Sequence, residues 1–580
     1  MADATGFVSL GTRQPRERRR YDAIVVGSGI AGGWAAKELC ERGLETLVLE
    51  AGGPIAADGS DYVEHIQAYD MKFRGWGDRQ DMARTQPIQR DCYACSETGR
   101  KFFVNDIENP YTTPPDAKFN WFRGRQVGGR SITWGRQVYR WSDLDFEANA
   151  RDGHGTDWPI RYADLAPWYT HVERFIGVTG AAEGLAQLPD GDFLPPMELN
   201  AAERVGRERL ARAFGGTRVL TIGRAAILTR AHRGRAACHY CGPCERGCVT
   251  HSYFSSVGST LPAARATGRL TLRPHSVAAE VLVHPDTGRA RGVRVIDART
   301  MEEHVFEARV VFLCASAIES VRLLLNSRSL RHPDGLANSS GTLGRYVMDH
   351  HFGGGASGTM PGLLDRRTRG ARPNGTYIAR FRNLAGGPAS RDFVRGYGLQ
   401  GGAGRNGWGR GGGMPGWGAD FKQALIDDLG PWTMSHGGWG ETLPHADNRI
   451  TLDPAVRDKW GIPAARIEVR WRENELAMHR DVVESAMEML DAMGCTDIRA
   501  NRTLHPPGHC IHEMGGARMA RTAKDGVLDR WNRAWDVPNL YVTDGAAMAS
   551  SACQNPSITY MALTARAAAH AAGQFKRRAL

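Results

Sequence analysis

The stretch Asp22-Ala-Ile-Val-Val-Gly-Ser-Gly-Ile-Ala-Gly32 decides the fold of this chain. A short apolar run leads directly into three glycines with the spacing of a dinucleotide-binding strand, turn and helix. Helix-forming residues continue to Glu41, and a second apolar run over residues 46–50 ends on an acidic side chain. This order of strand, glycine turn, helix, strand and acid predicts a Rossmann-like βαβ unit, and therefore an α/β fold.

Each glycine of this turn has a separate physical task. Gly27 permits the tight turn, Gly29 lets the backbone approach a pyrophosphate, and Gly32 lets the helix pack against the strand. Free amide groups at the N-terminus of the helix would then face the phosphates. The residues predicted to contact the cofactor here are Gly27, Gly29, Ile30, Ala31 and Gly32.

Glu50, at the end of the second strand, is predicted to accept hydrogen bonds from the adenosine ribose. A carboxylate at this position disfavours a 2′-phosphate, so NADP is a poor candidate. The sequence contains one such unit, and Glu50-Ala-Gly-Gly is typical of flavoproteins. We therefore predict FAD rather than NAD.

Length and composition limit the number of domains and the classes of protein that this chain can belong to. A chain of 580 residues is long enough for two or three domains. Its 42% apolar and 24% charged residues are ordinary for a globular protein, whereas glycine, at 70 residues, is in excess. No apolar run reaches the roughly 18 residues of a transmembrane helix. The net charge of +11 comes without a nucleic-acid-reading motif, so we do not expect a nucleic-acid partner.

Arg18-Arg19-Arg20 followed by apolar residues has some likeness to a twin-arginine export signal. The apolar residues that follow, however, are the first strand of the nucleotide site, and no small-residue cleavage site comes after a suitable apolar region. We therefore expect this chain to carry no export signal of its own.

Four further motifs follow in a fixed order: Gly124-Arg-Gln-Val-Gly128-Gly129-Arg-Ser131, His512-Glu-Met-Gly515-Gly516, Leu540-Tyr-Val-Thr-Asp544-Gly545 and Asn555-Pro556-Ser-Ile-Thr559. Together with the first glycine turn, this ordered set resembles the glucose–methanol–choline (GMC) oxidoreductases, whose FAD domain is assembled from separated pieces. The resemblance extends over nearly the whole chain.

The resemblance implies an active-site pair. His512 matches the family's catalytic base, and Asn555 matches its partner, which would hold the substrate oxygen. Histidine suits the task because its ordinary pKa of about 6.5 lies near working pH. An alcohol would lose a proton to His512 and a hydride to flavin N5, and would so become a carbonyl compound.

The resemblance also implies contacts to FAD from segments far from the first turn. The residues concerned are Gly128, Gly129, Ser131, Val277, Asp544, Gly545, Asn555 and Pro556. Relatives with covalently bound flavin have a histidine where this sequence has Thr133, so noncovalent FAD is expected. Many relatives have a glycine where this sequence has Ser316.

Four cysteines lie close together in Cys238-His-Tyr-Cys241-Gly-Pro-Cys244-Glu-Arg-Gly-Cys248. They cannot all pair in unstrained disulfides, and thiolates from one loop suit soft metals, so zinc and an iron–sulfur cluster both fit. This insertion, residues 238–248, resembles that of bacterial membrane-linked sugar dehydrogenases, which hold a three-iron cluster near the flavin. The resemblance implies Cys238, Cys244 and Cys248 as ligands of a 3Fe-4S cluster. Cys241 would be the fourth ligand of a 4Fe-4S cluster or a free thiol.

The other cysteines have less distinctive patterns. Cys92 and Cys95 are predicted to form a local disulfide or to remain two buried thiols. The five single cysteines stand in apolar surroundings and are predicted to be buried: Cys40, Cys314, Cys495, Cys510 and Cys553.

Four histidines besides His512 require an interpretation. His505 and His509 could join His512 in a metal site, but Pro506-Pro-Gly508 interrupts any helix that would align them. His350 and His351 are expected to pack near the FAD or substrate cavity without a catalytic role.

The pieces of the nucleotide site divide the chain between two domains. The FAD-binding domain is predicted to comprise residues 20–55, 105–140, 225–330 and 505–580, with a hairpin around Asp286-Thr-Gly288. A substrate-binding domain built on an antiparallel sheet is predicted from residues 56–104, 141–224 and 331–504. Its sheet is expected to contain strands at 450–452 and 466–472, and residues 474–493 have helical periodicity.

Residues 396–418 are rich in glycine and include Trp408 and Trp417. This composition favours a flexible surface loop. The alternative is a lid whose two tryptophans stack on sugar faces.

Two local sequences most resemble the FAD-containing subunit of glucoside 3-dehydrogenases: Gly129-Arg-Ser-Ile-Thr-Trp-Gly-Arg-Gln and Trp141-Ser-Asp-Leu-Asp. Those enzymes oxidise a ring hydroxyl to a keto-sugar. A sugar dehydrogenase is therefore expected, with electrons leaving through an iron–sulfur cluster. The alternatives are a gluconate, fructose or glucose dehydrogenase subunit and a related sugar oxidase. A zinc-stabilised flavoprotein that carries electrons without substrate chemistry is the alternative from another class.

Relatives with the cysteine insertion work with a small exported subunit and a cytochrome. The resemblance therefore implies these partners, and a periplasmic location that the chain reaches as part of a complex. Without such partners, the chain would be cytoplasmic.

Overall fold

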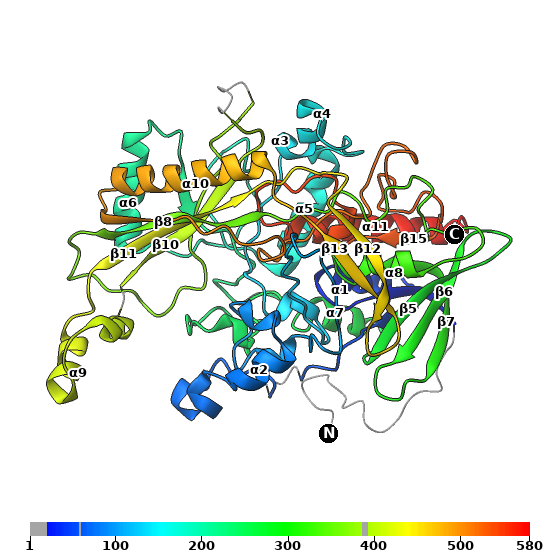
Figure 1. Cartoon of the computed structure of the whole chain (residues 1–580), viewed down its shortest axis with the longest axis horizontal. Helices are drawn as coiled ribbons and strands as arrows, with labels where there is room; N and C mark the ends of the chain where they lie inside the picture. The colour runs from blue at the N-terminus through cyan, green and yellow to red at the C-terminus, as the bar shows by residue number, and fades with distance from the viewer. Residues whose placement is uncertain (1–19, 57–59, 386–391, 406) are drawn as a thin grey trace.

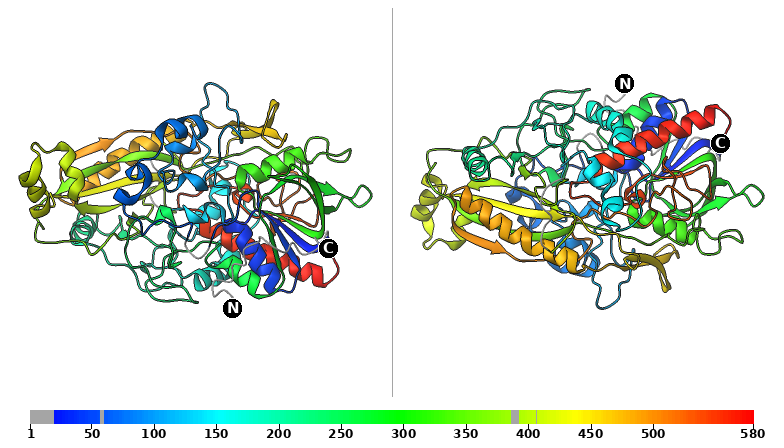
Figure 2. Two further views of the ribbon diagram at one scale, coloured as in Figure 1. Left: turned by 90° about the horizontal axis from the view of Figure 1, so that it is seen from below. Right: turned by 90° about the horizontal axis from the view of Figure 1, so that it is seen from above.

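A computed structural model describes residues 20–56, 60–385, 392–405 and 407–580 of this chain. Two β-sheets lie toward opposite ends of the long axis, and the segments that connect them meet between the sheets (Figures 1 and 2). The expected α/β class and the second, antiparallel sheet are confirmed. Arg18 and Arg19, from the run with a likeness to an export signal, lie outside the described residues.

The first sheet has seven strands and contains the predicted βαβ unit. The strands are β1 (Arg20–Val26), β2 (Thr46–Leu49), β4 (Leu270–Arg273), β5 (Ser276–Val283), β6 (Ala290–Asp297), β7 (Glu303–Leu313) and β15 (Leu540–Val542). Their order is β4-β2-β1-β7-β6-β5, and β15 pairs with the end of β7. β4, β2, β1, β7 and β15 run parallel, whereas β5 and β6 form the expected antiparallel hairpin.

Two helices cover this sheet through small side chains. α1 (Ile30–Glu41) starts at the glycine turn, and all of its residues from Ala31 to Cys40 are buried. Ala35 of α1 shares a core with Ala568 of α11 (Ser557–Lys576). Because alanine adds one carbon beyond the backbone, these helices can approach each other closely.

The second sheet has six strands, and every neighbouring pair is antiparallel. In order, the strands are β14 (Thr496–Asn501), β8 (His351–Met360), β11 (Trp432–Gly440), β10 (Tyr397–Arg405), β9 (Thr376–Ile378) and β3 (Leu220–Ile222). α10 (Glu473–Ala492) lies along one face, where Met478 and Met489 enter the same core as Trp432 (Figure 1). α10 confirms the helix expected over residues 474–493.

β12 (Arg449–Arg457) and β13 (Pro463–Glu468) form a separate two-stranded sheet. The expectation that they belong to the antiparallel sheet of the substrate-binding domain is therefore wrong. Ile450 and Ile467 share the main core with Leu324 of α8 (Ala317–Asn326). Burial of apolar side chains on the side of the seven-stranded sheet decides where this hairpin lies.

The other helices connect the sheets or cover their edges. They are α2 (Arg79–Thr85), α3 (Asp143–Phe146), α4 (Ala148–Asp152), α5 (Tyr162–Ile176), α6 (Ala201–Ala213), α7 (Thr260–Ala266) and α9 (Gly418–Asp427). Within the described ranges, no helix combines the length and the apolar character needed to cross a membrane.

The two sheets draw their strands from different parts of the chain. All strands of the first sheet fall within residues 20–55, 225–330 and 505–580, and all strands of the second fall within 141–224 and 331–504. The division into two domains and its boundaries remain predictions.

The glycine-rich residues 397–405 form the strand β10, in contrast to the expected surface loop. Glycine is needed there because the neighbouring strand lies very close: a Cβ on Gly401 would lie 1.9 Å from the backbone oxygen of Ser435. Trp408 and Trp417, beyond the strand, are 64% and 91% exposed. Neither lines the central cavity, so the structure does not support a lid that carries them.

Replacement of Gly401 by alanine is expected to destabilise the second sheet, because the added methyl group meets backbone atoms. We expect Gly401→Ala to lower the free energy of unfolding by about 1–3 kcal/mol, measured as a lower unfolding temperature at one scan rate. Gly404 lies in the same strand, and an added Cβ there has no atom within 4 Å. Gly404→Ala is therefore the control, and equal unfolding temperatures for both variants would contradict this account of β10.

Candidate functional site

A cavity of about 740 Å³ lies at the carboxyl ends of the parallel strands. Residues that follow four strands line it: Gly27 after β1, Glu50 after β2, Cys314 after β7 and Asp544 after β15. In open parallel sheets, ligands bind at this edge, outside the carboxyl ends of the strands. This cavity is therefore the candidate site.

The structure brings most of the predicted site residues to this one cavity. Those that line it are Gly27, Gly29, Ile30, Ala31, Glu50, Gly129, Ser131, Val277, His512, Asp544, Gly545, Asn555 and Pro556. Gly32 and Gly128 do not line it, and the four cysteines of residues 238–248 surround a second, smaller cavity. Segments from both ends of the chain thus share one site.

The three glycines of the first turn have different surroundings. Gly27 has φ +95°, and a Cβ there would lie 2.4 Å from the Cys314 oxygen. A Cβ on Gly32 would lie 1.9 Å from the Gly27 oxygen. At Gly29 the nearest atom to an added Cβ is 3.9 Å away, and this residue opens onto the cavity. The packing of the chain itself therefore requires glycine at positions 27 and 32, whereas position 29 leaves room for a pyrophosphate.

Glu50 is buried at the cavity wall and holds the first turn together. Its Oε2 accepts hydrogen bonds from the Ser28 amide (3.1 Å) and hydroxyl (2.6 Å), and its Oε1 accepts from the Gly52 amide (2.8 Å). Burial raises the pKa of Glu50, and these donors oppose the rise. Oε1 keeps an acceptor position for a ribose hydroxyl.

Arg125 is a cavity residue that the sequence motifs did not reveal. Its guanidinium stacks on the Trp460 ring at 4.0 Å, and its Nη2 is buried without a hydrogen-bond partner among the described residues. Arg123 also lines the cavity. Buried guanidinium N–H groups of this kind suit a phosphate. The available sequence signal is their position, because Arg123 directly precedes the glycine motif of residues 124–131 and Arg125 lies inside it.

Ser316 precedes α8 and lines the cavity with φ +86° and ψ +157°. Glycine adopts this backbone conformation far more readily than serine does. Ser316 therefore has a backbone conformation typical of glycine, which is the residue that the family resemblance implies for many relatives at this position.

His512 and Asn555 lie side by side on the cavity wall. His512 Nε2 is 3.3 Å from Asn555 Nδ2, and Asn555 Oδ1 accepts a hydrogen bond from Gln400 Nε2 at 2.6 Å. Because Gln400 donates to the amide oxygen, the Asn555 NH₂ group is the one that faces His512. Gln400 comes from β10, and no sequence pattern distinguishes it from other polar residues.

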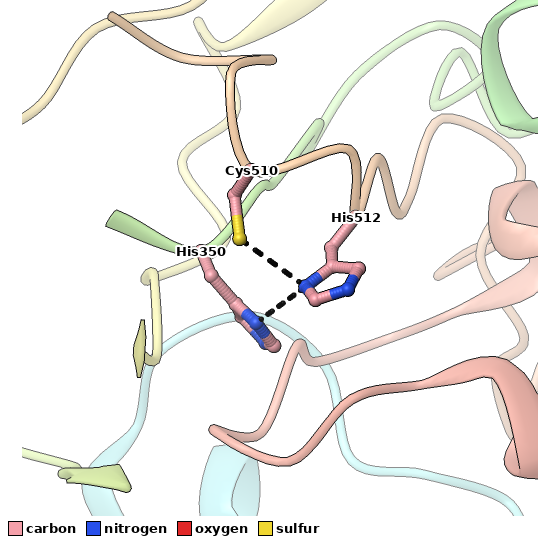
Figure 3. A group of neighbouring side chains, drawn as sticks. All are labelled: His350, Cys510 and His512. Atoms are coloured by element: carbon pink, nitrogen blue, oxygen red, sulfur yellow. Dashed lines mark hydrogen bonds between the residues drawn. The ribbon is translucent and has the colours of Figure 1, made fainter. Parts of the chain in front are cut away.

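The opposite edge of the His512 ring contacts His350 and Cys510 (Figure 3). His512 Nδ1 lies 3.0 Å from His350 Nδ1 and 3.3 Å from Cys510 Sγ. Burial, followed by His350 and Arg130, holds the pKa of His512 well below its ordinary value of 6.5. Burial lowers the pKa of His350 to about 4. Both rings are therefore neutral at neutral pH, and His512 can accept a proton.

The backbone around His512 is held by two acidic residues. Asp349 accepts hydrogen bonds from the amides of His512 (3.0 Å) and Gly508 (2.8 Å). Glu513 pairs at 2.8 Å with Arg130 of the glycine loop. Burial, followed by the Glu513 charge, raises the pKa of Asp349 to about 7. These contacts connect the segment of the candidate base, His512, to the glycine loop of residues 124–131, which is predicted to contact the flavin.

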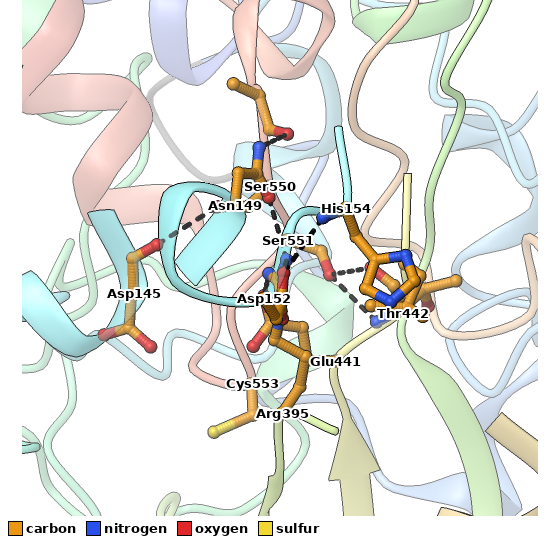
Figure 4. A network of polar contacts seen from close by, with 12 residues as sticks. Asp145, Asn149, Asp152, His154, Arg395, Glu441, Thr442, Ser550, Ser551 and Cys553 are labelled. Carbon is orange, nitrogen blue, oxygen red and sulfur yellow. Dashed lines mark hydrogen bonds and ion pairs between the residues drawn. The ribbon is translucent and has the colours of Figure 1, made fainter. Parts of the chain in front are cut away.

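A buried polar network fixes the segment of residues 549–555 (Figure 4). Arg395 donates to Glu441 at 2.6 Å and to Asn149 at 2.9 Å, and Asn149 donates to the Ala549 oxygen at 2.8 Å. Chain regions from both predicted domains thus position the residue at the end of this segment, Asn555.

His505 and His509 do not join His512 in a metal site. Their rings stack on each other at 3.9 Å, and Phe352 stacks on both. The donor atoms of His350, Cys510 and His512 lie within 4.8 Å of one another, but hydrogen bonds already connect them.

Cys238, Cys241, Cys244 and Cys248 surround the second cavity, together with Tyr253. All four are free thiols. The loop therefore has the donor set of a metal–sulfur site.

The residues that follow the cysteine loop contact both glycine motifs. The Ser256 hydroxyl donates to the Gly29 oxygen at 2.8 Å, and its amide donates to the Ser131 hydroxyl at 3.0 Å. The Tyr253 hydroxyl donates to the Ile132 oxygen at 2.5 Å. One short segment therefore lies between the two cavities.

The remaining seven cysteines are buried free thiols. For Cys92 and Cys95, the structure agrees with two buried thiols rather than with a disulfide, and burial raises the pKa of Cys92 to about 11. Cys510 is buried as expected, yet it also contacts the candidate base.

Two family models, both described as GMC oxidoreductase, match residues 21–351 and 444–564. The chain belongs to the GMC oxidoreductase family. A 2-methyl-1,2-propanediol dehydrogenase of Mycolicibacterium austroafricanum is 31% identical over 96% of this chain and 95% of that protein. The fructose dehydrogenase large subunit of Gluconobacter japonicus is 25% identical over 94% and 97% of the two chains. A crystal structure of formate oxidase, with 15% identity and a TM-score of 0.61 over 96% of this chain and 99% of that one, shows the same fold.

As a GMC oxidoreductase, the protein is an FAD enzyme that acts on CH–OH groups of alcohol- or sugar-type substrates. The cavity fits this cofactor. It combines an open backbone position at Gly29, a free acceptor position on Glu50 and an unpartnered guanidinium nitrogen on Arg125.

Replacement of Gly29 by alanine is expected to weaken FAD binding without unfolding the protein. The chain leaves room for the methyl group, which would instead occupy the space of the pyrophosphate. We expect the flavin content per protein to fall at least about tenfold, with an unchanged unfolding temperature of the flavin-free protein.

Gly32→Ala is the contrasting variant, because its methyl group meets the Gly27 backbone and should reduce both stability and flavin content. Full flavin content in Gly29→Ala would show that this position does not face the cofactor.

Proposed function

We propose that this GMC oxidoreductase is a dehydrogenase that oxidises a ring hydroxyl of a sugar or glycoside, with C3 as the first candidate. The observation that carries the proposal is the pair formed by His512 Nε2 and the Asn555 amide on the wall of the FAD cavity. A neutral imidazole nitrogen and an amide N–H, side by side, can hold one hydroxyl group by both its hydrogen and its oxygen.

The reaction follows from the chemistry of this pair. The substrate hydroxyl donates its hydrogen to His512 Nε2, and its oxygen accepts a hydrogen bond from the Asn555 amide. As the carbon–hydrogen bond breaks, His512 takes the hydroxyl proton and Asn555 stays bound to the oxygen that becomes the carbonyl. Bound FAD supplies the hydride acceptor. Gln400 keeps the Asn555 amide in this orientation.

The surrounding wall supports a polyhydroxylated substrate. Gln137, Arg136 and Gln400 contribute polar side chains to the cavity lining, and Phe352 and Trp439 contribute aromatic ones. Trp439 and Phe352 pack against each other at 5.0 Å. A sugar presents hydroxyl edges and apolar C–H faces, and a site of mixed polar and aromatic groups binds both.

The cysteine loop supports a route for electrons out of the cavity. Cys238, Cys244 and Cys248 would hold a 3Fe-4S cluster, or all four cysteines a 4Fe-4S cluster. The Tyr253 and Ser256 contacts connect this loop to the glycine motifs. A small exported subunit, a cytochrome acceptor and a periplasmic location complete the proposal, and they rest on the sequence resemblance alone.

Three alternatives lead to different observations. A sugar oxidase would reduce oxygen as fast as an artificial acceptor, and it would have no use for the cysteine loop. A zinc-stabilised electron carrier would have no use for the His512–Asn555 pair. A gluconate, fructose or glucose dehydrogenase subunit would differ from the glycoside enzyme in substrate preference.

Replacement of His512 by alanine tests the catalytic proposal. Because a general base contributes about 10²–10⁴-fold, we expect anaerobic bleaching of the flavin by methyl glucoside, fructose, gluconate or 1,2-propanediol to slow by that factor. The flavin content should stay unchanged. His570→Ala is the control, since His570 stacks on Trp531 and does not line the cavity. Bleaching of His512→Ala at the rate of the parent protein would disprove the role of His512.

The cysteine loop is tested by metal analysis of the purified holoprotein. We expect iron and acid-labile sulfide together with the EPR signal of an iron–sulfur cluster, and loss of all three in Cys244→Ser. Cys495→Ser is the control, because Cys495 is a buried thiol in the core under the second sheet. Retention of the signal in Cys241→Ser would assign a three-iron cluster. One zinc ion in place of iron would contradict the proposed electron route.

A further inference from the structure

We infer that His350 is a positioning residue, which holds His512 in the tautomer with hydrogen on Nδ1 so that Nε2 faces the substrate as a base. The inference rests on the proposed function, in which His512 accepts the hydroxyl proton. It adds the residue directly before β8 to the catalytic arrangement, although the sequence predicted no catalytic role there.

The direction of each hydrogen bond follows from a carbonyl group. His350 Nε2 lies 3.2 Å from the backbone oxygen of Ser551. A carbonyl oxygen can only accept, so His350 Nε2 must carry the hydrogen. In the neutral ring, His350 Nδ1 is then an acceptor, and His512 Nδ1, at 3.0 Å, must donate to it.

The other edge of His512 agrees with this assignment. With its hydrogen on Nδ1, His512 has a lone pair on Nε2, and the Asn555 NH₂ group lies 3.3 Å from that atom. Asn555 is oriented separately, since its oxygen accepts from Gln400. One chain of hydrogen bonds comes to His512 from Gln400 through Asn555, and the other leads from His512 through His350 to Ser551. Both place the hydrogen of His512 on Nδ1 and the lone pair on Nε2.

Burial makes this arrangement necessary. His350 is fully buried, and no water-exposed position is open to its ring. The other group near His512 Nδ1 is Cys510 Sγ at 3.3 Å, and a thiol is a weak acceptor. Without His350, little would prevent the imidazole hydrogen from moving to Nε2, where it would block proton transfer from the substrate.

The same contact serves the protonated state. After His512 accepts the substrate proton, its Nδ1–H still has His350 Nδ1 as its acceptor. The charged groups around the pair are Asp349, Arg130 and Glu513, with His351 and Cys510 as titratable neighbours. Asp349 directs its carboxylate to backbone amides, so it does not replace His350 at the ring.

Two substitutions of similar size separate positioning from packing. The Oδ1 of asparagine occupies nearly the place of imidazole Nδ1, so His350→Asn keeps an acceptor for His512. His350→Leu fills the space without one. We expect His350→Leu to slow flavin reduction about 10²-fold or more, because loss of the correct tautomer can cost up to about 10⁴-fold. We expect His350→Asn to stay within about tenfold of the parent protein, with substrate affinity and flavin content unchanged in both variants.

The pH dependence provides a readout that packing alone would not change. In the parent protein, kcat/KM should stay high well below pH 6.5, because the base has a lowered pKa and remains unprotonated. In His350→Leu, kcat/KM should stay low across the same pH range. A neutral His512 with its hydrogen on Nε2 is already deprotonated, so a higher pH does not restore the correct tautomer. Equal rates of flavin reduction in His350→Leu and the parent protein would overturn the inference.

A measurement on the unmodified holoprotein covers the case in which the variants do not fold. Isotope-edited NMR of labelled histidine, assigned with His512→Ala, should show hydrogen on Nδ1 of His512. Hydrogen on Nε2 of His512 would refute the inference that His350 sets the tautomer of His512. A stoichiometric zinc or copper ion bound by His350, Cys510 and His512 would also refute this inference. Failure of the proposed function is distinguishable, because His512→Ala would then reduce the flavin normally.

Discussion

Ser256 makes the contacts on which the rest of the site depends. Its hydroxyl and its amide hydrogen-bond to Gly29 and Ser131, so one residue holds the two glycine loops together. The segment of Ser256 and Val257 also packs so closely on two other glycines that side chains would not fit there. A Cβ on Gly33 would lie 2.7 Å from Ser256 Oγ, and one on Gly128 would lie 2.6 Å from Val257. Part of the glycine excess is therefore the consequence of close backbone packing around one buried serine.

A different constraint acts on the base, since in the described part of the chain the hydrogen-bond partners of the His512 ring are His350, Cys510 and Asn555 rather than a carboxylate. In a Ser-His-Asp triad, an acidic side chain binds the imidazole directly and stabilises its charged form. Here Asp349 binds the backbone of the His512 loop, and a neutral histidine occupies the position at Nδ1. Burial then lowers the pKa of His512, which keeps the ring ready to accept a proton.

Local patterns in the sequence predicted the elements whose formation depends on neighbouring residues. The spacing of Gly27, Gly29 and Gly32 predicted the first βαβ unit, and the periodicity after residue 473 predicted α10. The glycines of β10 were interpreted as a loop, because the reason for them lies in the adjacent strand β11. The hairpin of β12 and β13 was placed in the wrong sheet for the same reason, since its partner in the core is α8.

The sequence by itself determined the family, the order of the cofactor motifs and the identity of the candidate pair, His512 and Asn555. These depend on residue type and on spacing along the chain. Only the tertiary structure decided the roles of Gln400, Arg125 and His350 in the site, because these roles depend on contacts between segments that lie far apart in the sequence. It also decided the protonation of the base, since pKa and tautomer depend on burial and on hydrogen-bond partners that lie far away in the sequence.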